Sequence, residues 1–212
     1  MSISSIQQQS FERPAWTVIS ENISNPKNWI YLVPTIGAVA LCVFLAPATA
    51  PLGIAAGVII FSVNGLVALA LKVANLVTED PDSEYQKTLL EYPLLATLVA
   101  PILEEGFFRG LVQPLAARTI LLVAPAAAAL YLGTGLSIAV TISIVATAAI
   151  FGLAHCFNNH KNSHIQALTA TCGGVAFGLL AAQFGLPAAI AAHMVNNTIA
   201  MTITKLFHDR TS

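Results

Sequence analysis

Apolar residues run through most of this chain in long stretches, separated by short polar, glycine-containing or proline-containing breaks. The stretches cover residues 29–49, 51–76, 92–114, 119–134, 136–155, 165–184 and 187–205. A helix needs about 20 mostly apolar residues to cross the hydrocarbon core of a bilayer. The pattern therefore predicts an all-α, polytopic transmembrane bundle of about seven helices. The fourth stretch is short and contains Pro125, so its fusion with a neighbour would change the count.

The polar segments divide the chain into four parts. Residues 1–28 form a polar N-terminal segment without the charged start and apolar core of a secretory signal. Residues 29–77 hold two N-terminal membrane helices, and an acidic stretch at 78–91 separates them from the helices of residues 90–205. Residues 206–212 are a polar tail. The breaks contain the Gly, Pro and polar residues expected between helices.

Composition supports a membrane protein. The chain is 56% hydrophobic and only 9% charged, whereas soluble domains have about 25% charged residues. A net charge of −1 without a basic cluster predicts no nucleic-acid partner. Cys42, Cys156 and Cys172 are scattered and form no CxxC motif, so neither a disulfide framework nor a cysteine metal site is predicted.

Small residues recur at four-residue spacing in three of the stretches, which in membranes allows helices to approach closely. The pairs are Gly53 and Gly57, Gly106 and Gly110, and Gly174 and Gly178. We predict that all three pairs serve helix packing.

A few strongly polar residues lie inside the apolar stretches. They are Lys72, Glu104, Glu105, Arg109, His155, His193, Asn196 and Asn197. Lys72 is near the end of its stretch, from which a long side chain reaches the interface. An ionisable group at membrane depth costs at least ~2.5 kcal/mol, so such groups usually face a polar cavity with a function.

The third stretch carries three of these charges. Glu105 precedes Arg109 by four residues, the favourable arrangement for an ion pair on one helix face. Glu104 is rotated by about 100° from Glu105, so it is predicted to lack a partner within its helix. Pro101 has no N–H to donate to the carbonyl of Thr97, so we expect the helix to be irregular beside Glu104.

The remaining polar residues come from two later stretches. His155 ends the fifth, and His193 and Asn197 lie one helical turn apart in the last. We predict that they share one polar site with Glu104. Glu104, His155 and His193 are competent zinc ligands, with water as the fourth. Alternatively, Glu104 and His155 deprotonate a water without metal, while His193 and Asn197 stabilise an oxyanion. Both interpretations predict hydrolysis.

Three segments resemble the motifs EExxxR, FxxxH and HxxxN. They are Glu104–Arg109, Phe151–His155 and His193–Asn197, in that order and on separate predicted helices. In this respect the chain, over about residues 90–200, resembles the CPBP family of intramembrane proteases, also called the CAAX protease and bacteriocin-processing family. The resemblance implies a catalytic core at 90–205, with Glu104 as the water-activating residue or ligand and Glu105 and Arg109 as its supporting pair. The third motif matches Asn197 rather than its neighbour Asn196.

The resemblance further implies an integral, multi-pass membrane endopeptidase that cleaves CAAX-type or other membrane-bound peptide or lipidated substrates. Family members are commonly described as metalloproteases, although a metal-free glutamate mechanism is also argued. The membrane would be the plasma or inner membrane in a bacterium and the endoplasmic reticulum in a eukaryote. Two other functions stay open: a non-proteolytic immunity factor or scaffold, and a small proton-coupled transporter that uses the intramembrane carboxylates.

Overall fold

A computed structural model describes residues 26–74, 76, 90–128, 130, 135–158 and 161–211, and all regular elements among them are helical. The elements, with η for π-helical turns, are α3 (Pro26–Leu45), α4 (Ala50–Val73), η1 (Leu95–Val99), α6 (Ala100–Phe107), η2 (Phe108–Val112), α7 (Gln113–Val123), α8 (Pro125–Ala128), α9 (Ile138–His155), α10 (Ser163–Phe184) and α11 (Leu186–Thr211). The all-α prediction is confirmed. Residues 1–25 of the polar N-terminal segment, 78–89 of the acidic stretch and residues 131–134 lie outside the described residues.

One long helix replaces two of the predicted ones. From η1 to α7 the chain is helical from Leu95 to Val123 without interruption, so the predicted separation of the stretches 92–114 and 119–134 is wrong. A π-helical turn ends just before Gln113, and Pro114 lies in the first turn of α7, a position that accommodates proline. The predicted helix at 119–134 is therefore divided between the end of α7 and the short α8. The described residues thus contain six long helices rather than seven.

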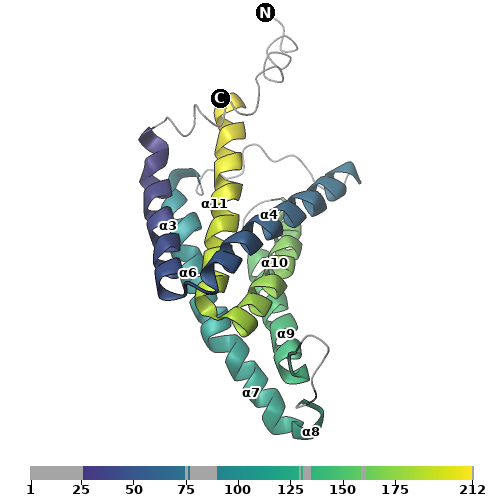
Figure 1. The fold of residues 1–212 in the computed structure, drawn as a ribbon. Coiled ribbons are helices and arrows are strands. Elements are labelled where there is room, and N and C mark those ends of the chain that lie inside the picture. The colour runs from purple at the N-terminus through teal and green to yellow at the C-terminus, as the bar shows by residue number, and fades with distance from the viewer. Residues whose placement is uncertain are drawn as a thin grey trace, which may run out of the picture.

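Helix α11 lies at the centre of the arrangement, with α3, α4, α6 and α10 against it (Figure 1). Helix α9 packs on α10, and α7 runs along α9 away from the centre. Gly185 makes the turn between α10 and α11 with φ +90°, a left-handed conformation suited to glycine, and its N–H closes α10 on the carbonyl of Ala181. This tight turn brings both α10 and α11 against the long helix from η1 to α7, with α11 contacting α6 and the glycines of α10 contacting η2 and α7.

Two of the three glycine pairs lie at close helix contacts. A side chain at Gly53 or Gly57 of α4 would overlap the backbone of Ala188 or Ala192 of α11, so small residues on both helices set this contact. Gly174 and Gly178 of α10 face η2 and α7. The prediction is wrong for Gly106, where a side chain would meet open space.

Within the part of the chain that the structure describes, three helices are long and apolar enough to cross a membrane, judged by length and composition: Ala50–Val73, Ile138–His155 and Ser163–Phe184. The apolar part of α3, Leu32–Leu45, is shorter. Helix α11 extends to Thr211, beyond the expected end at 205. Large apolar side chains remain exposed along these helices, for example Phe44 at 81% and Leu69 at 57%, as expected for surfaces that face lipid.

Candidate active site

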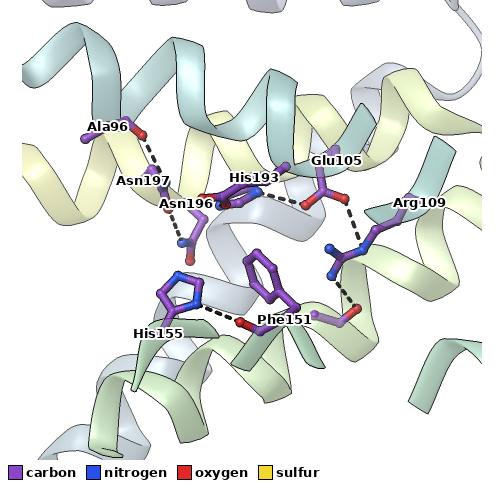
Figure 2. A network of polar contacts seen from close by, with 10 residues as sticks. Ala96, Glu105, Arg109, Phe151, His155, His193, Asn196 and Asn197 are labelled. Carbon is purple, nitrogen blue, oxygen red and sulfur yellow. Dashed lines mark hydrogen bonds and ion pairs between the residues drawn. The ribbon is translucent and has the colours of Figure 1, made fainter. Parts of the chain in front are cut away.

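The predicted ion pair between Glu105 and Arg109 forms at the centre of the bundle. Arg109 Nε lies 3.2 Å from Glu105 Oε2, and both side chains are fully buried. Arg109 Nη2 also donates to the carbonyl of Gly174 at 2.9 Å, so the guanidinium ties α10 to the helix that carries the glutamates (Figure 2). Its Cζ atom lies 4.7 Å from the ring centroid of Phe151, within the range of a cation–π contact. The positive charge of Arg109 is thus stabilised by a carboxylate, a backbone carbonyl and an aromatic ring.

One helical turn after Arg109, the side chain of Gln113 makes a second contact with α10. Gln113 Nε2 donates to the carbonyl of Gly178 at 3.2 Å, as Arg109 does to that of Gly174. A side chain at Gly174 would approach Arg109 Nη2 to 3.1 Å, and one at Gly178 would approach Gln113 Oε1 to 2.9 Å. The two glycines therefore provide accessible carbonyls as well as a close contact. Gln113 was not among the predicted site residues, although its four-residue spacing from Arg109 could have indicated that it shares a helix face with Glu105 and Arg109.

His193 of α11 contacts both glutamates. Its Nδ1 lies 2.8 Å from Glu105 Oε1, and its Nε2 lies 3.7 Å from Glu104 Oε2. A carboxylate oxygen accepts hydrogen bonds, so Nδ1 is the donor to Glu105. The imidazole stacks on Phe177 with 4.6 Å between ring centroids, which fixes its plane. Glu105 is therefore bonded to the histidine as well as to Arg109, a contact that its spacing along the chain did not predict.

The two glutamates differ in their access to solvent. The side chain of Glu104 is 32% exposed, whereas that of Glu105 is fully buried. Glu104 also lies within electrostatic range of both His193 and His155. It is thus the carboxylate of the pair that a water or a substrate can reach, as the 100° rotation along the helix implied.

His155 is held at the end of α9. Its Nδ1 lies 2.8 Å from the carbonyl of Phe151, one helical turn earlier, and the rings of the two residues meet edge to face (Figure 2). Because a carbonyl only accepts hydrogen bonds, Nδ1 is the donor and Nε2 is left for chemistry. The arrangement resembles the outer-shell contact that orients catalytic and metal-binding histidines.

Asn197 is anchored by a carbonyl that η1 leaves free. The N–H of Ala100 donates to Leu95, so the carbonyl of Ala96 has lost its α-helical donor. The next candidate donor, Pro101, has no N–H. Asn197 Nδ2 supplies the missing bond to Ala96 O at 3.0 Å. The irregularity expected near Pro101 is therefore confirmed, and it binds a site residue in place.

Hydroxyl groups support the same π-helical turn. Thr97 is fully buried, donates to the carbonyl of Pro93 at 2.9 Å and shares a 3.0 Å hydrogen bond with Thr35 of α3. Helix α3 is thereby tied to the turn that holds Asn197. Nothing in the local sequence pattern indicated this pair, because the two threonines are 62 residues apart.

The residues expected to bind zinc, Glu104, His155 and His193, do converge on the site from three helices. However, the described residues contain no group of three His, Cys, Asp or Glu side chains placed to hold a metal ion. One nitrogen of His193 is committed to Glu105, and its other nitrogen faces Glu104 rather than a shared centre. The arrangement thus does not fit a three-ligand zinc site, and zinc binding stays a prediction.

Together, apolar helices of membrane-spanning length and a central cluster of carboxylates, histidines and amides describe an integral membrane protein with a buried polar site. Residues 87–199 match the family model of the Rce1-like type II CAAX prenyl endopeptidases. This chain belongs to that family, within the CPBP intramembrane proteases. Searches of the curated proteins and of the solved structures found no significant match.

Proposed function

We propose that this protein is an intramembrane endopeptidase that cleaves a peptide bond of membrane-associated substrates with a water activated by Glu104 and His155. The observation that carries the proposal is the unequal environment of the two adjacent glutamates. Glu105 is buried and bonded to Arg109 and His193, while Glu104 is partly exposed beside the same histidine. Only Glu104 is free to exchange a proton with a water.

In the first step Glu104 takes a proton from the water, whose oxygen attacks the carbonyl carbon of the scissile bond. His155 accepts a hydrogen bond from the same water through Nε2, because its Nδ1 donates to the carbonyl of Phe151. Glu105 takes no part in the proton transfer. Its contribution is to orient His193 through the 2.8 Å bond, while Arg109 holds Glu105 in place.

In the second step the negative charge on the carbonyl oxygen must be stabilised. Asn197 has one amide N–H left after donating to Ala96, and His193 directs a second N–H toward the site when its Nε2 carries a proton. Collapse of the tetrahedral species breaks the C–N bond, and Glu104 returns its proton to the leaving amine. A preorganised oxyanion donor is worth about 10²- to 10³-fold in rate.

The membrane setting supports substrates that are themselves held at the bilayer. The site lies among helices whose outer surfaces are apolar, so we propose a multi-pass protein and a peptide or lipidated CAAX-type protein as substrate. Whether the membrane is a plasma or inner membrane or the endoplasmic reticulum follows from the cell in which the protein acts.

The test is cleavage by protein reconstituted in liposomes with prenylated CAAX peptides and unlipidated membrane peptides as reporters. We expect the wild type to cleave at least one class, and Glu104→Gln to lose ~10³-fold or more because the base is removed. Glu91→Gln, at an exposed glutamate that precedes η1, is the matched control and should leave cleavage unchanged. Unchanged cleavage by Glu104→Ala and His155→Ala would show that the assigned site is wrong.

A cellular phenotype that survives Glu104→Gln would instead support the immunity or scaffold role. Proton-coupled uptake that the same variant abolishes would support transport. Both outcomes would contradict the proposed hydrolysis.

A further inference from the structure

Asn196 lies beside the site but has no part in the reaction proposed above. Its Nδ2 donates to Asn197 Oδ1 at 3.0 Å, and its own Oδ1 is buried without a hydrogen-bond partner among the described residues. Figure 2 shows the amide of Asn196 pointing toward the imidazole of His155. An unpaired buried oxygen costs about 1–3 kcal/mol. The hydrogen bond that the described residues show for the Asn196 side chain is made by its amide nitrogen.

The orientation of both amides follows from one backbone group. The two ends of an asparagine amide have nearly the same shape, so the hydrogen bonds around it decide which end is oxygen. The carbonyl of Ala96 only accepts, which places the nitrogen of Asn197 on that side. The oxygen of Asn197 must then lie on the opposite side, where it needs a donor. Asn196 Nδ2 is that donor.

We propose that Asn196 is a positioning residue that locks the amide of Asn197, so that the second N–H of Asn197 faces the oxyanion. This inference rests on the proposed function. If the bond were lost, a half-turn of the Asn197 amide would present its oxygen to the developing negative charge and would break the bond to Ala96. Both consequences oppose catalysis, yet neither changes the packing of α11.

Two variants separate this role from packing. Asn196→Ala removes the donor, and Asn196→Asp keeps the size of the side chain but places an oxygen against Asn197 Oδ1. We expect both variants to lower kcat about 10- to 100-fold, which is no more than the effect of removing a complete oxyanion donor. The KM of both variants should stay within about twofold of the wild-type value. Thr198→Val is the matched control, since the Thr198 hydroxyl donates to the carbonyl of Met194 in its own helix at 2.7 Å. It should keep full activity.

A double-mutant cycle tests whether Asn196 acts through Asn197. In an Asn197→Ala background, the further change Asn196→Ala should have no effect on kcat, because there is no amide left to position. If the two substitutions instead multiply, Asn196 has a separate role and the proposal is rejected.

A readout independent of proteolysis is the exchange of the Asn197 side-chain amide hydrogens with water, followed by NMR on protein with ¹⁵N-labelled asparagine. The Asn197 signal is identified by its loss in Asn197→Ala. We expect exchange at least ~10-fold faster in Asn196→Ala and unchanged in Thr198→Val. Unchanged exchange in Asn196→Ala overturns the proposal. Faster exchange in a protein that cleaves no reporter supports the positioning role and shows that the proposed function itself is wrong.

Discussion

Replacing Arg109 by methionine tests whether the buried ion pair holds the centre of the bundle together. Methionine has a similar length and no charge, so the main change is electrostatic. The variant leaves Glu105 fully buried without the Arg109 guanidinium and removes the 2.9 Å bond to Gly174. Breaking a buried pair by removing one partner costs about 3–5 kcal/mol. We therefore expect a loss of this size in the free energy of unfolding.

The double variant Glu105→Gln and Arg109→Met provides the comparison. Glutamine keeps an oxygen that accepts the 2.8 Å bond from His193 but carries no charge to be left unpaired. We expect the double variant to recover at least about half of the loss, because neutral replacement of both partners removes the desolvation penalty. Arg118→Met, at an exposed arginine on α7, is the control and should change stability by less than about 0.5 kcal/mol.

The assay is denaturant unfolding in detergent micelles, followed by far-UV circular dichroism. Two results would refute the reasoning. A cost below about 1 kcal/mol for Arg109→Met would mean that the pair is not effectively buried in the folded protein. A double variant at least as unstable as the single one would mean that Glu105 and Arg109 are not coupled.

Two further predictions concern packing and metal. Gly57→Ala should lower the free energy of unfolding by about 1–3 kcal/mol, because the new Cβ would lie 2.5 Å from the Ala192 carbonyl oxygen and 2.9 Å from Val195 Cβ. Gly65→Ala is the control and should not lower it, because a Cβ at Gly65 meets open space. Equal effects of the two substitutions in the same unfolding assay would show that the contact of α4 with α11 is looser than described. If Glu104, His155 and His193 hold zinc, elemental analysis of gently purified protein should find about one metal per chain, lost in His155→Ala. An active preparation without stoichiometric metal would reject zinc.

The predicted helices agree with the structure where glycine or polar loops separate the apolar stretches and also at Pro51, where α3 and α4 are separate helices, but they fail at Pro114. Pro114 lies inside a continuous helix because the π-helical turn before it moves the proline into the first turn of α7. Pro101 has the same relation to η1 and α6. A single-sequence pattern cannot distinguish a helix that ends before a proline from one that continues through it. The difference lies in whether the N–H groups before the proline bond to the carbonyl four or five residues earlier.

In the site, too, the contacts within one helix were predictable from the sequence and the contacts between helices were not. The pair of Glu105 and Arg109 was predictable because both residues are on one helix face, and periodicity determines that geometry. The bond between His193 and Glu105 joins residues 88 positions apart, and no local rule brings them together. The sequence motif likewise matched Asn197 and gave no role to Asn196. Its role as a hydrogen-bond donor becomes visible only when the contact with Ala96 has fixed the orientation of the Asn197 amide.

From the sequence alone follow the helical class, the membrane setting and the identity of the polar residues, because each depends on composition and on periodicity within one helix. Only the tertiary structure decides how these residues divide the work. The turn at Gly185 and the small residues of α4 and α11 set the distances between helices, and these distances place His193 between the two glutamates. Hydrogen bonds act over about 3 Å, so partners on different helices are chosen by packing rather than by their order along the chain.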